Sequence, residues 1–377
     1  MKPMKLALYL PNFRDEVTVK ELEDLTATAE ALDFDSVWTL DRIVVPEASD
    51  EGKLQYPFGM MDQFPLALPV GSRGQWFSGM ALIPWLAAKT KKVRIGMSII
   101  DTPYRAPAVL AGEIATVDQL SGGRVNVGIG SGWMPEEFAA ASAAHIFPKR
   151  HKHVRETIEI MQGIWTNDLF EYHGEFADFD RCGFGAKPVQ NPHPPIYFSG
   201  LKDPKRSAAR IAKYGLSGWI GIQDTPEEIS RWRTEIQREL DEIGSGRTLD
   251  SGFDMCSMIW FVITDEPTDQ TPQGKGSNLL VGTAGQIADN LFSGSRTLTY
   301  TAFVSSPDPY ILATTSDGYL FCCTFRPPED LRAWSDFLTG NEQDADVGVR
   351  SEHSLLQSGL TGVTDAFARR VADAEVQ

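Results

Sequence analysis

Apolar and polar positions alternate along the first 240 residues in two rhythms. Short runs of β-branched and aromatic residues, typical of buried strands, are separated by longer stretches whose apolar positions lie three or four residues apart, as in amphipathic helices. In the stretch 18–32, Leu22 and Leu25 follow the helical spacing, and Thr18 and Glu21 have the spacing of a capping box. Strands that alternate with helices in this way predict βαβ units and a parallel sheet.

Eight apolar runs are candidate strands, the number that closes a (β/α)8 barrel. They cover residues 6–10, 35–39, 93–100, 125–130, 196–199, 217–220, 255–263 and 298–304, and helices are expected over 18–32, 77–88, 108–119 and 151–165. The expected fold class is therefore α/β, a TIM barrel formed by residues 1–304, with residues 305–377 as a C-terminal extension of unclear role. Within that extension, YILATTSDGYLF predicts a hairpin with Asp317-Gly318 at its turn, and a short helix is expected over 329–338.

Residues 45–75 interrupt this rhythm between the second strand and the next helix. They are rich in Pro, Gly and Asp and too long for an ordinary βα loop, which predicts a lid or pocket insertion. Their apolar members, among them Phe58, Met60 and Phe64, favour an adaptable cover over a hydrophobic pocket. A second excursion, 170–194, is aromatic and proline-rich and is expected to be structured.

The overall charge narrows the set of partners. The formal net charge is −16 and the isoelectric point is about 4.9, which disfavours binding to nucleic acid or to an anionic membrane surface. No run approaches the ~18 uninterrupted apolar residues that span a bilayer, and the first residues resemble a strand more than a signal peptide, so a cytoplasmic location is expected. The four cysteines have neither a disulfide-framework nor a CxxC spacing, which predicts reduced thiols and no metal site.

The C-terminal ends of the expected strands are the first place to look for chemistry, because the active site of such a barrel lies there. Small and polar residues predominate at these positions: Asn12, Asp41, Arg42, Asp101, Ser131, Gly132, Ser199 and Gly200. Such residues permit close backbone approach and offer N–H donors, which suits a planar, anionic cofactor. The GIGSGW sequence around Ser131 is not a dinucleotide fingerprint, since it does not open a helix directly.

One expected helix start carries clustered positive charge. Ser199-Gly200 is followed by Lys202, Lys205 and Arg206. The helix dipole favours an anion at this end and disfavours basic side chains unless an anion is bound. The alternative is a solvated basic first turn.

Arg150, His151 and His153 cluster at another helix start. A histidine at such a position is often a surface residue, because the helix N-terminus opposes its protonated form. Arg150 and a neutral His151 could instead donate hydrogen bonds to a phosphate or to a substrate oxygen.

Asp41-Arg42 and Asp101 follow neighbouring strands. They could form a structural ion pair, or they could place charge next to a reacting group. Tyr104-Arg105 is expected to fix the loop after the third strand. No Ser-His-Asp order, HExxH or paired-carboxylate signature indicates hydrolase chemistry.

Several long motifs resemble, in the same order, those of the bacterial luciferase-like flavin- and F420-dependent oxidoreductases. They are RIGMSIIDTPYRAPAVLAGEIATVDQLSGGRVNVGIGSGWMPEEF, KRHKHVRETIEIMQGIWTNDLFEYHGEF, KPVQNPHPPIYFSG and AARIAKYGLSGWI, and LVGTAGQIADNL extends the resemblance to roughly residue 304. The resemblance implies a barrel with the cofactor across the strand C-termini, and it implies a homodimer.

The resemblance also implies where each end of the cofactor binds. The ring would lie near Asn12, Ile100, Asp101, Ser131 and Gly132. The phosphate would lie near Arg150, His151, Ser199 and Gly200. A non-proline cis peptide is expected around Ile100–Asp101.

Two features depart from the family pattern. Many relatives have a histidine after the acidic residue of the second strand end, whereas Asp41 is followed here by Arg42. Because arginine does not deprotonate, Arg42 is expected to stabilise an anion through charge-assisted hydrogen bonds. The segment 305–377 also differs from the family's usual final strand and helix. The candidate catalytic residues are Asp41, Arg42 and Asp101.

Three functions remain open. In the first, a two-component monooxygenase, reduced FMN from a separate flavin reductase reacts with molecular oxygen, and a small hydrophobic molecule is oxidised. The alternative is F420-dependent hydride transfer, which the WTLDRIVVP stretch and the insertion after it favour. The third is a non-catalytic flavin-binding protein, since fold alone does not imply activity; the intact polar strand ends argue against it.

Overall fold

The computed structural model describes residues 5, 7–12, 17–31, 33–47, 72–199, 203–222, 226–258, 260–263, 279–282, 311–314 and 319–323. Several predictions lie outside these residues. They are most of the 45–75 insertion, the strand expected over 298–304, the Asp317-Gly318 turn and the helix expected over 329–338.

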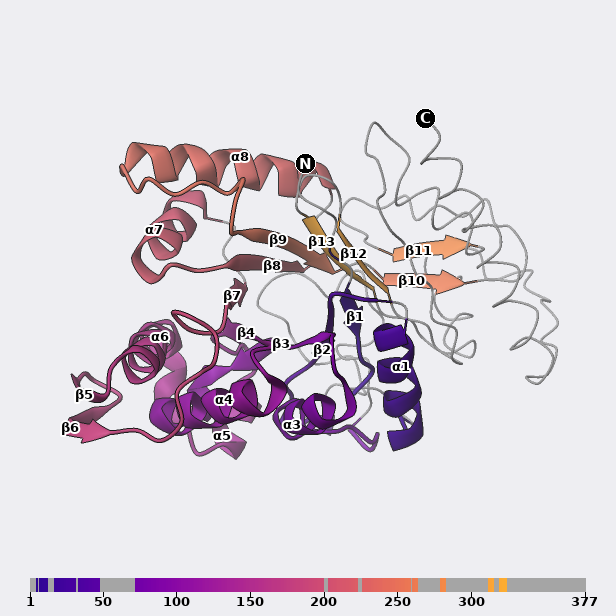
Figure 1. Ribbon diagram of the computed structural model, residues 1–377, viewed down its shortest axis with the longest axis horizontal. Helices are drawn as coiled ribbons and strands as arrows, with labels where there is room; N and C mark the ends of the chain where they lie inside the picture. Colours follow the sequence, from indigo (N-terminus) through magenta and orange to yellow (C-terminus); the bar gives the residue numbers. More distant parts are fainter. Residues whose placement is uncertain are drawn as a thin grey trace.

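A nine-stranded sheet forms the centre of the molecule (Figure 1). In spatial order its strands are β1 (Ala7–Tyr9), β2 (Ser36–Thr39), β3 (Arg94–Asp101), β4 (Val125–Gly130), β7 (Ile196–Ser199), β8 (Gly218–Ile222), β9 (Asp254–Met258), β13 (Tyr319–Cys323) and β12 (Ile311–Thr314). Every neighbouring pair is parallel except β12 with β13. Because parallel strands end on the same edge, the C-terminal ends of β1, β2, β3, β4, β7, β8 and β9 lie together.

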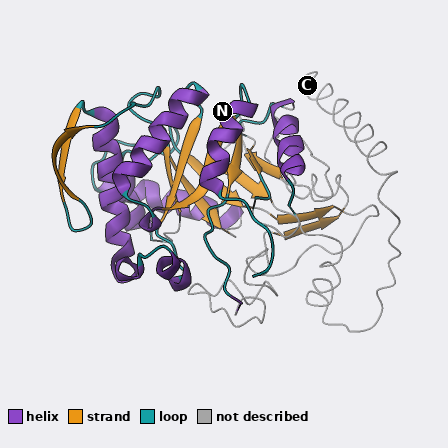
Figure 2. Cartoon of the chain, turned by 90° about the horizontal axis from the view of Figure 1, so that it is seen from below, coloured by secondary structure: helices purple, strands orange, loops and turns teal. Residues whose placement is uncertain are grey.

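The sheet curls until its two ends meet. Strands β12 and β13 lie against β1, at the opposite end of the hydrogen-bonded order. Helices cover the outside of this curled sheet (Figure 2). The expected TIM-barrel architecture is therefore confirmed.

The hairpin expected from YILATTSDGYLF is confirmed as β12 and β13, which pair antiparallel with Ile311 opposite Cys323. β13 also pairs with β9, so this hairpin belongs to the main sheet. The single strand expected over 255–263 is wrong in extent, because the chain divides there into β9 and β10 (Trp260–Ile263). β10 pairs with β11 (Leu279–Gly282) in a separate two-stranded sheet. The domain boundary at residue 304 stays a prediction.

Helices form over all four predicted amphipathic stretches and after the expected helix start at Ser199-Gly200, and the helix over 226–242 was not predicted. The longer ones are α1 (Val19–Ala31), α3 (Gly79–Lys89), α4 (Pro107–Ser121), α6 (Arg150–Thr166), α7 (Pro204–Tyr214) and α8 (Pro226–Glu242). The capping box precedes α1, since the Thr18 N–H donates to Glu21 Oε2 at 2.8 Å and the Glu21 N–H donates to Thr18 Oγ1 at 3.2 Å. Gly122 ends α4 in the left-handed conformation with φ 68°.

Aromatic side chains fill the barrel interior. The rings of Trp38 on β2 and Tyr197 on β7 meet edge to face at 5.4 Å, and because two strands separate β2 from β7 this contact crosses the barrel. Glycines give these rings room: Gly96 lies against Trp38, and Gly218 lies against Tyr197. The Tyr197 hydroxyl donates to Asp254 at 2.9 Å.

The excursion expected over 170–194 begins with the hairpin of β5 (Leu169–His173) and β6 (Asp178–Gly183), which lies at one end of the molecule, beyond α6 (Figures 1 and 2). Within the described residues, no helix is long and apolar enough to cross a lipid bilayer.

Candidate active site

Asp41 and Asp101 lie at the C-terminal ends of β2 and β3, where the sequence predicts chemistry. Both are buried, with 4% and 6% of their surface exposed. Arg105 binds Asp41 through two hydrogen bonds, Nη1 to Oδ2 at 2.5 Å and Nη2 to Oδ1 at 2.8 Å. The Asp101 N–H also donates to Asp41 Oδ2 at 3.1 Å. Asp41 is therefore held in one orientation by the loop that follows β3.

The pKa of the Asp101 carboxyl group is strongly perturbed. Burial, reinforced by the negative charge of Asp41, raises the pKa of Asp101 to about 8, although Arg42 and the Gly132 N–H act in the opposite direction. A pKa in this range favours the protonated carboxyl group at neutral pH. A buried carboxylic acid in this state can donate a proton.

Arg42 pairs with a residue that sequence reasoning missed. Its Nη1 lies 2.6 Å from Oε2 of Glu137, on the short helix α5 (Pro135–Ala140). Glu137 also accepts from the Ile43 N–H at 2.9 Å and from the Tyr104 hydroxyl at 2.9 Å. Burial raises the pKa of Glu137, and the charge of Arg42 opposes this rise. The only signal in the sequence was the acidic start of a short helix soon after β4.

The sequence left two interpretations of Asp41, Arg42 and Asp101 open, a structural ion pair or a charge next to a reacting group. These contacts decide between them in part. Ion pairs do form, but Asp41 pairs with Arg105 and Arg42 pairs with Glu137. The guanidinium of Arg42 also lies 5.5 Å from the centre of the Trp133 ring. We call Asp41, Arg42, Asp101, Arg105 and Glu137, with Tyr104, the carboxylate network.

Asn12 joins strand ends. Its Nδ2 donates to the carbonyl oxygens of Leu40 and Phe77, both at 2.9 Å, and its Oδ1 accepts from the Leu40 N–H at 2.8 Å. This buried amide therefore links the segment after β1 to the backbone of Leu40 and Phe77. Contact between Asn12 and the cofactor ring stays a prediction.

The non-proline cis peptide lies at Ser98–Ile99, within β3, so its predicted position at Ile100–Asp101 is wrong by two residues. The Tyr9 hydroxyl donates to the Ser98 carbonyl at 2.8 Å. Ile99 lies over Gly130 of β4 and is partly exposed, whereas Ile100 is buried in the hydrophobic core. Ile99 is therefore the better placed of the two isoleucines to face a ligand.

Ser131 and Gly132 form the loop between β4 and α5, and both are partly exposed. Gly132 has φ +65°, and a Cβ there would meet the Tyr104 hydroxyl and the Phe138 ring. The loop therefore requires glycine at this position. It places the Gly132 N–H beside the acid of Asp101.

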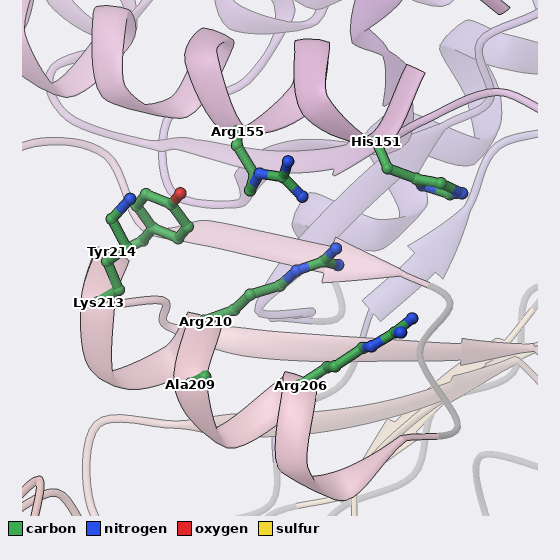
Figure 3. A pocket seen from close by; sticks show the side chains of 7 residues that line it. All are labelled: His151, Arg155, Arg206, Ala209, Arg210, Lys213 and Tyr214. Carbon is green, nitrogen blue, oxygen red and sulfur yellow. The ribbon is translucent and has the colours of Figure 1, made fainter. Parts of the chain in front are cut away.

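A cationic groove lies between α6 and α7. It has a volume of about 500 Å³ and is lined by His151, Arg155, Arg206, Ala209, Arg210, Lys213 and Tyr214. Figure 3 shows His151 and Arg155 extending from α6 toward Arg206 and Arg210 on α7. Both helices follow strands of the main sheet, so their N-termini lie on the same side as the carboxylate network.

One predicted phosphate ligand, His151, lines this groove, and Arg150 precedes it at the start of α6. Burial and the surrounding arginine charges lower the pKa of His151, so it is neutral and can donate one hydrogen bond. Arg150 stacks on the Phe147 ring at 4.4 Å and donates to the Phe147 carbonyl at 3.0 Å. Its buried Nε has no partner in the described part of the chain. Ser199 is partly exposed at the end of β7, and Gly200 lies outside the described residues.

The sequence matches the model of the family described as luciferase-like monooxygenase over residues 4–271. An FMNH2-dependent dimethylsulfone monooxygenase of Pseudomonas putida is 29% identical over 237 residues, which are 62% of this chain and 61% of that protein. The chain thus spans about three fifths of that relative's length.

Solved structures share the fold. An F420-dependent secondary alcohol dehydrogenase in complex with an F420-acetone adduct has a TM-score of 0.54 and 21% identity, with 70% of each chain covered. The oxygenating constituent of 3,6-diketocamphane monooxygenase from Pseudomonas putida, in complex with FMN, has a TM-score of 0.52 and 18% identity and covers 70% of this chain and 68% of that one. With a family match over most of its length, the chain belongs to the luciferase-like monooxygenase family.

Proposed function

We propose that the protein is a flavin-dependent oxidoreductase that binds reduced FMN across the C-terminal ends of its strands and, with molecular oxygen, oxidises a small hydrophobic molecule. The observation that carries this proposal is the pairing of two unlike sites along one edge of the sheet. A buried carboxyl group with a raised pKa, Asp101, lies at the strand ends beside Asp41, and a cationic groove lies beyond β4 and β7. The relative of Pseudomonas putida named above supports the choice of cofactor.

The residues present fit the phosphate of such a cofactor. Arg150 offers a buried Nε without a partner among the described residues, and His151 is neutral. Ser199 adds a partly exposed hydroxyl at the end of β7. These donors lie at the start of α6 and before α7, where helix dipoles also favour negative charge.

When bound, reduced FMN would supply the two electrons and the activation of oxygen. The protein's own residues would hold a proton and transfer it. Asp101 holds one on its carboxyl group, next to the Gly132 N–H, and can deliver it to an oxygen that becomes negatively charged during the reaction. Asp41 fixes the backbone of Asp101 and, through its negative charge, keeps the proton on that carboxyl group.

Arg42 has a narrower role than the sequence suggested. Its charge is balanced by Glu137, so it stabilises a substrate anion only as part of a pair. We propose that the pair forms a wall of the substrate pocket, beside Trp133. The segment 45–75 would cover this pocket, and its apolar residues favour a hydrophobic substrate.

We also propose a homodimer, a cytoplasmic location and supply of reduced FMN by a separate flavin reductase. For the dimer, α4 offers Val109 and Leu120, which are 59% and 70% exposed. They lie about three helical turns apart on one face. Sedimentation of a Leu120→Glu variant tests this: a monomer would support the dimer interface on α4, and an unchanged dimer would place the interface elsewhere.

A second candidate is hydride transfer with F420. The observation that favours it is the number of cationic side chains in the groove, which exceeds what the phosphate of FMN requires. The carboxyl group of Asp101 would then exchange a proton with the substrate oxygen.

Anaerobic titration of the full chain with FMN, reduced FMN and F420, followed by exposure to oxygen, separates these functions. Tight binding of reduced FMN, with oxygen consumed and substrate oxygenated, supports the monooxygenase. Selective binding of F420 without reaction with oxygen moves the function to hydride transfer. Failure to bind any of the three overturns both.

A further inference from the structure

Glu137 binds two loops at the strand ends at once. Its Oε2 accepts from Nη1 of Arg42 at 2.6 Å and from the Tyr104 hydroxyl at 2.9 Å, and its Oε1 accepts from the Ile43 N–H at 2.9 Å. Arg42 and Ile43 follow β2, and Tyr104 follows β3. The side chain of Glu137 is fully buried. One buried carboxylate therefore receives three donors from two loops.

These contacts favour the ionised form of Glu137. A proton on Oε1 would face the Ile43 N–H, and a proton on Oε2 would face the guanidinium of Arg42. A carboxyl group whose oxygens both face donors is stabilised as the anion. Burial raises the pKa of Glu137, and the charge of Arg42 and these hydrogen bonds oppose the rise. The contacts therefore describe a charged pair.

The Asp101 carboxyl group has charged and titratable neighbours on three elements. They are Asp41 and Arg42 after β2, Tyr104 and Arg105 after β3, and Glu137 on α5. Burial raises the pKa of Tyr104, so its hydroxyl stays neutral. Within this set the two guanidinium groups and the two carboxylates balance each other, and Asp101 adds no charge as long as it keeps its proton.

A chain of contacts leads from Glu137 to Asp101. The Tyr104 hydroxyl donates to Glu137, and a Cβ on Gly132 would lie 2.8 Å from that hydroxyl. The Gly132 N–H donates to the Asp101 carboxyl group. Both carboxyl groups are buried, so charges act on one another with little screening by water.

Loss of the Glu137 charge would leave the guanidinium groups in excess. Ionisation of Asp101 would restore the balance, because a nearby positive charge favours the carboxylate. Burial raises the pKa of Asp101, Arg42 lowers it, and Glu137 raises it. Since a carboxylate has no proton to donate, an ionised Asp101 would not serve as an acid.

We propose that Glu137 is a positioning residue for proton transfer, whose carboxylate balances the charge of Arg42 and thereby keeps the proton on Asp101. This inference deepens the function proposed above and rests on Asp101 as its proton donor. A Glu137 that only held the two loops together would not control that proton.

The test is a pH titration of the ligand-free full chain, labelled with carbon-13 at its aspartate carboxyl groups and followed by NMR. The signal of Asp101 is the one that Asp101→Asn removes. Glu137→Gln keeps the shape of the side chain and removes its charge, and Arg42→Gln/Glu137→Gln removes both charges of the pair. Glu136→Gln, at the exposed neighbouring position, is the matched control.

In wild type the Asp101 signal should titrate at about pH 8. Glu137→Gln should lower this midpoint by about one to three pH units, whereas the double variant and Glu136→Gln should stay within about half a unit of wild type. An unchanged midpoint in Glu137→Gln would overturn the proposal. So would an equal fall in the double variant, which would place the effect in the lost loop contacts.

The pH dependence of turnover separates this inference from the proposed function. Because the acid must be protonated, kcat of Glu137→Gln should start to fall at a lower pH than kcat of wild type. Falls at the same pH would overturn the role in proton transfer. If the NMR midpoints move as expected and no reaction with reduced FMN is found, it is the proposed function that fails, and the hold of Glu137 on the Asp101 proton stands.

A second measurement applies if Glu137→Gln does not fold. The glutamate carboxyl groups of wild type are then labelled, and the signal of Glu137 is the one missing from the double variant. An ionised Glu137 throughout the titration of Asp101 would support the proposal. A Glu137 that takes up a proton within that titration would overturn it, because its charge would be absent where it is needed.

Discussion

The carboxylate network and the cationic groove both lie along the C-terminal edge of the sheet, yet they balance charge in opposite ways. In the network, Asp41 is matched by Arg105 and Arg42 is matched by Glu137, and the carboxylate of each pair is buried. In the groove, Arg155 and Arg210 repel each other with no carboxylate of the described residues between them. The network is therefore balanced by its own residues, whereas the described residues of the groove leave Arg155 and Arg210 unbalanced.

The largest expected effect concerns catalysis. Asp101→Asn removes the proton that the network holds and should lower kcat by at least about 100-fold, the usual contribution of a positioned general acid. Steady-state kinetics with the cofactor found by titration measure this. Asp180→Asn, on the exposed β6 strand, is the control. A loss of less than about fivefold would show that another group supplies the proton.

The same variant tests the charge state of Asp101. The pKa of Asp101 in the folded chain, about 8, lies above its unfolded value, so its contribution to stability is full below that unfolded value, near 4, and is lost as the pH rises to about 8. Wild type should lose stability relative to Asp101→Asn over this window, by at most about 1.4 kcal/mol per pH unit. Urea unfolding at pH 5, 7 and 8 measures the difference. Parallel curves would mean that Asp101 is ionised throughout.

Truncation of Glu137 removes the carboxylate that balances the charge of Arg42. Glu137→Ala leaves Arg42 buried without this carboxylate and should cost about 3–5 kcal/mol of unfolding free energy. Glu136→Ala, at the exposed neighbouring position, should change stability by less than about 0.5 kcal/mol. Equal effects in urea unfolding would contradict the buried ion pair.

A substitution in the loop between β4 and α5 should have a smaller effect on the free energy of unfolding. Gly132→Ala forces a side chain onto a left-handed residue beside Tyr104 and Phe138 and should cost roughly 1–3 kcal/mol. Gly112→Ala, in the middle of α4 with no atom near the added methyl group, should instead stabilise by about 0.5–1 kcal/mol. Two thermal unfolding curves that shift in the same direction would contradict the described loop.

The smallest expected effect on stability concerns Arg210, and it tests most directly whether the groove and the network differ in charge balance. Arg210→Gln removes a repelled charge, so the free energy of unfolding without ligand should stay within about 1 kcal/mol of wild type or rise slightly. Urea unfolding measures it. A loss as large as that of Glu137→Ala would show that the groove is balanced internally, like the network.

The sequence predicted features that depend on local spacing. The Thr18–Glu21 capping box and the glycine stop of α4 at Gly122 are set by residues a few positions apart, and both are confirmed. The strand ends that carry Asp41 and Asp101 were found because parallel strands bring their C-terminal ends together.

Partners that are distant in sequence were missed. Glu137 lies 95 residues from Arg42, and Arg105 lies 64 residues from Asp41. Pairing across such distances depends on how strands and loops pack, which hydrophobic periodicity does not encode. The approach of Arg155 and Arg210 in the groove was missed for the same reason, because they belong to different helices whose packing is fixed only in three dimensions.

The meeting of β1 with β12 and β13 has a consequence for the order in which the protein folds. These strands are about three hundred residues apart along the chain, and contacts that close so long a loop form slowly. The hydrogen bonds that connect the members of the carboxylate network to one another join residues from Asp41 to Glu137. A nascent chain would therefore assemble the carboxylate network early, on the first strands, and close the barrel last.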